Sequence, residues 1–392
     1  MGDARSAQVS MMTDKPYYVL LTGSKNNAGD FLIKHRAKQL LQKLRSDREL
    51  VDLNGWMPFD DSSLDVVNRA KALILLGGPA LQKKMRPKVY GLVDDLSKIR
   101  VPIVTAGIGW YSPNGEWKDT HDYALNQQTH ELLDRIAGDA FLSSVRDYHT
   151  LNTLHSLGYS NYAMTGCPAL YSWENLGKPV QLGDVNRVAF SLGVGMKSSR
   201  RMERQMRSAI LCTAEEFSGA DLSVVFHHGL SDNYLSSPGV TKELYKANKR
   251  MAAWLDSENI AYIDVSGSAE ALIEHYSGMD FHIGYRVHAH IFMSSISKPS
   301  ILLNEDGRGK ALGKVLGGTS LDAYEMVQHN KVIIIANRVG IPIDTMRPAR
   351  GFLNDLRRLI RYEKELGVRL QEPRDRIDRH FPVMKTFMER LP

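Results

Sequence analysis

The segment best suited to chemistry lies between residues 281 and 290, where three histidines and one arginine fall within ten positions. Arg286 stands two residues before His288, where a strand-like run would give way to a helix. A guanidinium presents a planar fork of donors that matches a carboxylate or a phosphate, and a histidine transfers protons near neutral pH. The spacing therefore predicts that Arg286 clamps an anionic substrate and that His288 is the proton-transfer residue.

Two other interpretations of this segment remain open. One is a metal site built from His282, His288 and His290, although no carboxylate or cysteine stands at close ligand spacing and no HExxH pattern occurs. The other is a polar strand end whose histidines are hydrogen-bonded. We expect neither a bound metal nor an organic cofactor.

Glycine-rich and cationic residues form a second group of candidates, because they stand where strand-like runs end and loops would begin. Glycine lets the backbone approach a ligand closely, and a helix N-terminus favours an anion. The substrate-binding candidates of the first kind are Asn27, Gly29, Asp30, Gly77, Gly78, Gly107 and Gly109. Those of the second kind are Arg146, His228, Arg308 and Lys310. Each loop alone could be an ordinary tight turn, and Arg146 with Asp147 could be a surface ion pair of little energetic value.

The elements that must position these residues alternate between apolar runs and helical patterns. Because the apolar runs are uniformly hydrophobic, they indicate parallel strands covered on both faces. The expected strands are Tyr17–Leu21, Leu73–Leu76, Val101–Ala106, Phe141–Val145, Arg187–Leu192, Leu222–Phe226, Ile260–Asp264, Asp280–Ile283 and Pro299–Leu303. The clearest expected helices are Phe31–Leu44, with Asp30 as its N-cap, Met202–Phe217, Thr241–Ser257 and Ala269–Tyr276. Ligands in such sheets bind beyond the carboxyl ends of the strands, which is where the candidate loops lie.

A change in composition divides the chain. Residues 171–186 contain glycine, proline, asparagine and aspartate without periodicity, which is typical of a linker. We therefore expect an N-terminal tail at 1–16, Rossmann-like domains at 17–170 and 187–340, and a helical C-terminal extension at 341–392. The predicted fold class is α/β, with two doubly wound domains facing a central cleft.

The order and spacing of four motifs resemble the polysaccharide pyruvyltransferase family over roughly residues 17–312. The motifs are Asn27-Ala28-Gly29-Asp30, Leu73–Leu76 with Gly77-Gly78, Val145-Arg146-Asp147 through Gly158-Tyr159, and Arg286-Val287-His288-Ala289 followed by Lys298-Pro299 and Lys310. The chain departs from the family pattern at Pro79, where a third glycine is usual, and at Cys167, where an acidic residue often precedes Pro-Ala. Since Arg286 and His288 are kept, these departures could alter the choice of acceptor rather than abolish activity.

The resemblance implies an arrangement like the GT-B fold of glycosyltransferases. It implies a transferase that moves a pyruvyl group from phosphoenolpyruvate to two hydroxyls of a sugar, releasing phosphate and leaving a pyruvate ketal in a glycan or glycan precursor. The acceptor would be a free sugar, a nucleotide sugar or a lipid-linked oligosaccharide. Such a reaction needs an anion clamp and proton transfer but no cofactor. A GT-B glycosyltransferase that uses a nucleotide sugar and a non-catalytic binder of anionic glycans are the alternatives.

Composition bounds these expectations. The 392 residues are 43% hydrophobic and 24% charged, which excludes disordered and fibrous classes. Two cysteines, Cys167 and Cys212, exclude a disulfide framework and suit a reducing compartment. A net charge of +6 is too mild to indicate a nucleic-acid partner but suits an anionic small molecule.

The sequence also bears on where the protein works. It contains no apolar run that could span a bilayer and no secretory signal, so we expect a cytoplasmic protein. Arginines in the C-terminal extension could touch the inner face of a membrane, although a solvated helix face explains them more simply. Assembly into a homo-oligomer is a further expectation.

Overall fold

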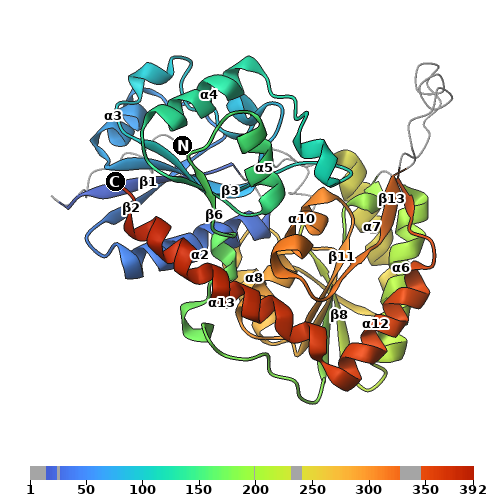
Figure 1. Ribbon diagram of the computed structural model, residues 1–392. Coiled ribbons are helices and arrows are strands. Elements are labelled where there is room, and N and C mark those ends of the chain that lie inside the picture. Colours follow the sequence, from blue (N-terminus) through green and yellow to red (C-terminus); the bar gives the residue numbers. More distant parts are fainter. Residues whose placement is uncertain (1–14, 24–26, 198, 231–240, 327–345) are drawn as a thin grey trace, which may run out of the picture.

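The computed structural model describes residues 15–23, 27–197, 199–230, 241–326 and 346–392. Within them, two six-stranded sheets follow one another along the chain, and helices cover both sheets (Figure 1). Every strand pairing in the two sheets is parallel. The boundary expected at residue 340 and most of the tail expected at 1–16 lie outside the described residues.

The N-terminal sheet has the strand order β2-β1-β3-β4-β5-β6. Its strands are β1 (Tyr17–Thr22), β2 (Glu49–Asn54), β3 (Ala72–Leu81), β4 (Ile103–Trp110), β5 (Ser143–Val145) and β6 (Tyr162–Met164). The helices between them are α2 (Ala28–Leu44), α3 (Asp61–Arg69), α4 (Gln127–Gly138) and α5 (Tyr148–Ser156). The chain changes direction across the sheet between β1 and β3, and a ligand crevice is expected at such a switch point.

The C-terminal sheet has the strand order β12-β11-β10-β7-β8-β9, which is the strand order of a Rossmann domain. Its strands are β7 (Arg187–Ser191), β8 (Asp221–Phe226), β9 (Ala261–Asp264), β10 (Phe281–Gly284), β11 (Ser300–Asn304) and β12 (Ser320–Asp322). The helices are α6 (Arg200–Glu216), α7 (Lys242–Ser257), α8 (Ala269–Ser277), α9 (Val287–Ser295) and α10 (Gly307–Leu316). The switch point lies between β7 and β10, so the segment after β10 opens onto the crevice. A short antiparallel pair, β13 (Tyr324–Met326) with β14 (Met346–Pro348), lies beside this sheet.

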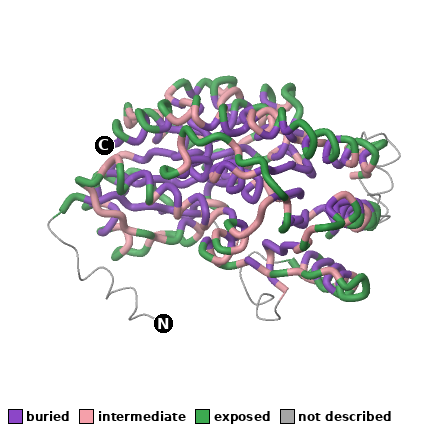
Figure 2. Tube along the Cα trace, turned by 90° about the horizontal axis from the view of Figure 1, so that it is seen from below, coloured by how far each residue is buried: buried purple, intermediate pink, exposed green. Residues whose placement is uncertain are grey.

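The sheet interiors explain why the apolar runs predict these strands. All residues of β1, β4 and β11 are buried, as expected for parallel strands covered on both faces. Figure 2 shows the buried trace running through the interior, with exposed segments on the outer helices. The predicted fold class is therefore confirmed. The sequence did not predict β2, β6 and β12, which are edge strands of the two sheets and are short or only half-buried.

Two local expectations were wrong. The pairs Gly77-Gly78 and Gly107/Gly109 do not form loops after their strands, because β3 and β4 continue through them. The helix near residue 30 begins at Ala28 and is capped by Asn27, whose Oδ1 accepts the Gly29 N–H at 3.2 Å, so Asp30 lies in its first turn rather than at its cap.

The C-terminal extension is helical, as predicted, and it consists of α12 (Phe352–Leu366) and α13 (Val368–Glu389). Helix α13 runs from the C-terminal sheet back along the N-terminal domain, so that the chain ends near β1 (Figure 1). Its residues Ile377, Met384 and Phe387 join the same apolar core as β1. The Tyr18 hydroxyl donates to the Pro392 carbonyl at 2.7 Å. The extension therefore ties the two domains together.

Candidate active site

Loops from both domains meet around a small cavity near the switch points of the two sheets. The residues that line it are Asn27, Arg146, His227, Tyr285, Arg286, Val287, His288, Glu305, Asp306, Arg308 and Gly309. Five of the predicted site residues therefore meet here: Asn27, Arg146, Arg286, His288 and Arg308. The free space is about 30 Å³, which is room for one or two water molecules. Side chains must move to admit a larger ligand.

Arg286 is held at the start of α9 by its own backbone. It is the N-cap residue of the helix, and its N–H donates to the Ser191 hydroxyl at the end of β7, at 3.1 Å. Gly284 permits this approach, since a Cβ there would lie 2.3 Å from the Ser191 hydroxyl oxygen. The guanidinium Nη1 lies 3.2 Å from Nε2 of His228. An arginine only donates, so this His228 nitrogen accepts.

His228 is thus placed beside the cavity rather than in its lining. Burial, followed by the charges of Arg286 and Arg308, holds the pKa of His228 well below its ordinary value. A neutral imidazole is what the hydrogen bond from Arg286 requires. His228 orients the guanidinium without competing for an anion.

The other two histidines of the 281–290 segment serve the core. The ring of His282 joins the hydroxyls of Ser191 and Ser300 at 2.9 and 2.8 Å, and His290 Nδ1 lies 2.7 Å from the Ser300 hydroxyl. Neither histidine lines the cavity. In the described part of the chain, no group of three or more histidine, cysteine or acidic side chains could hold a metal ion.

His288 lies in the first turn of α9, directly against the first turn of α2. A Cβ on Gly29 would lie 2.2 Å from His288 Nδ1, so Gly29 serves by making room for this ring. Burial, followed by Arg146, Arg308 and Arg286, lowers the pKa of His288 to about 3. The ring is therefore neutral at physiological pH in the absence of an anion. Among the described residues, its Nε2 has no hydrogen-bond partner.

Arg146 follows β5 and is buried, with only 4% of its surface exposed. Its guanidinium packs on Gly109, where a Cβ would lie 2.0 Å from Nε. Nε lies 3.4 Å from Asp147, which is a long contact, and Nη2 has no hydrogen-bond partner within the described ranges. A buried donor without a partner is costly, so Arg146 is suited to receive an anionic ligand.

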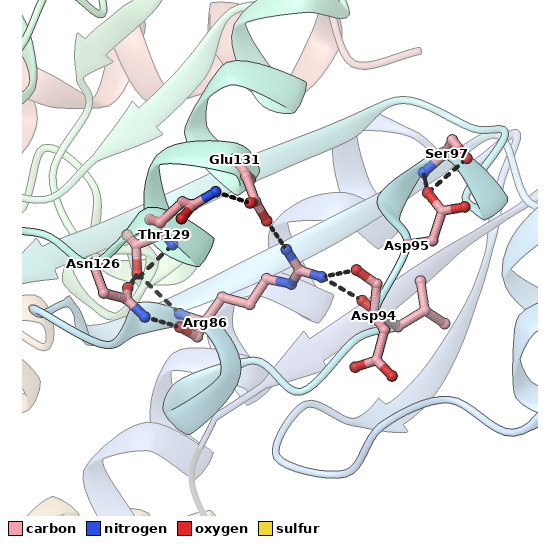
Figure 3. Close-up of polar contacts among 9 residues, drawn as sticks. Arg86, Asp94, Asp95, Ser97, Asn126, Thr129 and Glu131 are labelled. Carbon is pink, nitrogen blue, oxygen red and sulfur yellow. Dashed lines mark hydrogen bonds and ion pairs between the residues drawn. The ribbon is translucent and has the colours of Figure 1, made fainter.

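The buried Arg86 shows what a structural arginine looks like in the same domain (Figure 3). Its guanidinium donates to Glu131 at 2.9 Å, to the Val93 carbonyl at 2.7 Å and to the Asp94 carbonyl. These contacts fix the loop after β3 against α4. The contrast with Arg146 supports a binding role for the latter.

The third arginine comes from the start of α10. Arg308 donates to the Asp306 carboxylate from Nε at 2.9 Å and from Nη2 at 2.6 Å. Although burial acts to raise it, the pKa of Asp306 is lowered by Arg308. The neighbouring Glu305 accepts the backbone N–H groups of Val194 and Gly195, at 2.7 and 2.9 Å, and burial raises its pKa. Asp306 thus fixes the Arg308 guanidinium. Glu305 anchors the loop after β11 to the segment that follows β7.

A comparison with known protein families finds a match over most of this chain. The model of the polysaccharide pyruvyl transferase family matches residues 27–307, which include Arg146, Arg286 and His288 and end one residue before Arg308. The chain belongs to this family. Among curated proteins, no sequence matches it at a significant level.

The fold of the chain is similar to that of solved sugar-nucleotide enzymes. A putative UDP-N-acetylglucosamine 2-epimerase from Listeria monocytogenes is 12% identical, with a TM-score of 0.50 over 96% of this chain and 97% of that one. The S. aureus MnaA–UDP structure is 11% identical, with a TM-score of 0.49 over 96% and 99% of the two chains. At such identities the likeness concerns the fold alone, which is GT-B-like.

Several predicted site residues lie away from the cavity. Lys310 points to the other side of α10, where its Nζ lies 3.0 Å from Glu116 and 3.8 Å from Asp322. Gly77 and Gly107 allow β3 and β4 to lie close together, since a Cβ on Gly77 would lie 2.5 Å from the Gly107 carbonyl oxygen. Gly78 faces Asp30, with a Cβ at 2.9 Å from its Oδ1. These glycines shape the sheet edge below the site.

Sequence reasoning missed four residues with polar side chains that line the cavity. They are His227, Tyr285, Glu305 and Asp306. Tyr285 stands next to Arg286, and Glu305 and Asp306 directly follow β11, so position after a strand was the available signal.

Proposed function

We propose that the protein transfers a pyruvyl group from phosphoenolpyruvate to two hydroxyls of one sugar, forming a ketal and releasing phosphate. The observation that carries the proposal is the convergence of Arg146, Arg286 and Arg308 with His288 on one cavity between the domains. Phosphoenolpyruvate has a carboxylate and a phosphate, and planar guanidinium groups match both. The family match supports the transferase class.

In the proposed reaction, a proton adds to C3 of the donor and makes C2 electrophilic. One sugar hydroxyl attacks C2, and a second hydroxyl then displaces the phosphate. Each hydroxyl loses one proton: one replaces the proton delivered to C3, and the other leaves with the phosphate. A single proton-transfer residue beside C2 and C3 can therefore act first as acid and then as base.

His288 suits this role because of the charges around it. Without ligand, the three arginines and burial hold its pKa at about 3. Binding of the donor brings negative charge next to the ring and offsets the arginines, so the pKa rises toward neutrality. We infer that the donor itself prepares His288 to carry the proton, and that no metal or organic cofactor takes part.

We also propose that the reaction takes place in the cytoplasm, where phosphoenolpyruvate is available. No helix in the described parts of the chain is both long and apolar enough to cross a bilayer. Several arginines of the C-terminal extension that could meet lipid headgroups are engaged in ion pairs, namely Arg347, Arg357, Arg358 and Arg361. Subcellular fractionation tests the location.

The decisive experiment compares donors side by side. The full chain is incubated with phosphoenolpyruvate or with nucleotide sugars over a panel of glycan acceptors, and phosphate release and product mass are measured. We expect phosphate release that depends on both phosphoenolpyruvate and a sugar, and a product that carries pyruvate. Turnover of a nucleotide sugar without phosphoenolpyruvate would instead identify a glycosyltransferase.

A further inference from the structure

The cavity lined by Arg146, Arg286, Arg308 and His288 is called the arginine site. A second and larger cavity, of about 1030 Å³, lies next to it. Its lining residues are Gly115, Glu116, Trp117, Tyr148, His149, Asn304, Lys310, Gly313, Lys314, Ser320, Leu321 and Asp322. Both domains contribute to it. We propose that this cavity holds an uncharged oligosaccharide portion of the acceptor, an inference that rests on the proposed pyruvyl transfer.

No described residue lines both cavities, but residues that are close in sequence line one or the other, so the two cavities lie on neighbouring parts of the same segments. Arg146 lines the arginine site, and Tyr148, two residues on, lines the larger cavity. In the same way, Arg308 lines the first and Lys310 the second. The domains touch here, since the Gly307 N–H donates to the Ser112 carbonyl at 3.0 Å.

Two exposed aromatic side chains line the larger cavity and are held in place. Trp117 is 49% exposed and Tyr148 is 40% exposed. The Trp117 ring meets the ring of His149 edge-on at 5.0 Å, and His149 stacks on the buried Trp110 at 5.2 Å. Such fixed aromatic faces are suited to stack on the C–H face of a sugar ring.

Tyr148 is held by a hydrogen bond to His380 of α13. The Arg376 carbonyl lies 2.7 Å from His380 Nδ1, which must therefore donate, so Nε2 accepts the Tyr148 hydroxyl at 3.1 Å. The His149 ring is almost fully buried in the cavity wall, and its Nδ1 has no hydrogen-bond partner among the described residues. A hydroxyl-rich ligand could supply one.

The charges of the lining indicate an uncharged ligand. Two lysines, Lys310 and Lys314, face two carboxylates, Glu116 and Asp322, and Lys310 lies 3.0 Å from Glu116. This balance of charges differs from the excess of cations in the arginine site. It disfavours the diphosphate of a nucleotide sugar as a ligand. The volume lies at the upper limit of ~300–1,000 Å³ for small-molecule sites, so more than one sugar ring is expected.

The test measures binding of the labelled full chain to an array of neutral and charged glycans. For wild type we expect binding to neutral oligosaccharides. Trp117→Ala and Tyr148→Ala should weaken it about tenfold or more, whereas Tyr148→Phe keeps the ring and should stay within about threefold. Trp173→Ala is the matched control, because Trp173 is 37% exposed and lies outside this cavity. Thermal unfolding of each variant checks that it is folded.

The proposal is overturned if no neutral glycan on the array binds, if only nucleotide sugars bind, or if Trp117→Ala binds as well as Trp173→Ala. The array needs no phosphoenolpyruvate, so its result is independent of the donor. If phosphoenolpyruvate fails to support phosphate release while glycan binding depends on Trp117, the proposed function fails and the saccharide site stands. The reverse pattern overturns only the saccharide site.

Discussion

His288 is surrounded by three arginines and is nevertheless the side chain best placed to move a proton. It is neutral in the free protein, with a pKa of about 3, so it contributes no charge to the anion clamp. Its removal should therefore damage the chemistry much more than donor binding.

The first prediction follows from this separation of roles. His288→Ala should lower kcat by about 10²–10⁴ while the dissociation constant of phosphoenolpyruvate changes by less than about threefold. His288→Gln, which fills similar space but transfers no proton, should be equally slow. Steady-state phosphate release and a donor titration give the two numbers. Near-native kcat for His288→Ala between pH 6 and 8 would show that His288 only shapes the site.

For individual residues, the sequence predicted those whose side-chain type alone indicates anion binding or proton transfer. Arg146, Arg286, His288 and Arg308 could be selected because each follows a strand and matches an anion or a proton transfer. The position of Lys310 could not, because it stands two residues after Arg308, roughly 200° further around α10, and therefore lies on the side that meets Glu116. That choice depends on tertiary packing between the domains.

At the scale of elements, the contact between α2 and α9 sets the position of His288. Both helices begin near the crevice, and only a glycine at position 29 leaves space for the imidazole ring. The N-x-G-D motif at the start of α2 is thus explained by packing on a catalytic candidate as well as by capping.

The second prediction concerns this contact. Gly29→Ala places a Cβ 2.2 Å from His288 Nδ1, so the ring must shift and kcat should fall at least about tenfold, with about 1–3 kcal/mol of lost stability. Gly138→Ala is the control, because a Cβ at this end of α4 meets nothing within 4 Å. Activity and thermal unfolding are measured for both. Equal activity of the two variants would contradict the proposed role of Gly29.

Hydrophobic runs predicted the interior strands, whereas the edge strands lacked such a signal. Strand β2 has no fully buried residue and contains Glu49 and Asp52. Glycines were assigned to loops although β3 and β4 pass through them, because a glycine inside a strand and one after it look alike in sequence. The distinction depends on the neighbouring strand, which lies far away in the chain.

At the scale of the whole molecule, buried histidines link the site to stability. Burial lowers the pKa of His227, His228, His282, His288 and His290, and the pKa of His290 falls to about 4. In the unfolded chain these groups bind protons below about pH 6.5. The unfolded state then holds more protons than the folded state, so stability falls as the pH drops from about 6.5 toward 4.

The third prediction isolates one of these histidines. His290→Asn should lower the melting temperature at pH 7 but reduce the additional fall in melting temperature between pH 7 and pH 5. The reason is that each buried histidine lowers the free energy of unfolding by up to about 1.4 kcal/mol per pH unit as the pH falls. His121→Asn, at an exposed position, should leave the difference between the two pH values unchanged. Thermal unfolding at both pH values provides the comparison. An identical pH dependence in wild type and His290→Asn would contradict the argument.

The central claim is that phosphoenolpyruvate binds to the arginines between the domains. Calorimetric titration of phosphoenolpyruvate into wild type, Arg286→Lys and Arg357→Lys tests it most directly. We predict binding to wild type, at least about tenfold weaker binding to Arg286→Lys because a point charge cannot replace the planar fork, and unchanged binding to Arg357→Lys, whose guanidinium pairs with Glu215 on the surface. Absence of binding to wild type, or equal binding to wild type and Arg286→Lys, would contradict the claim.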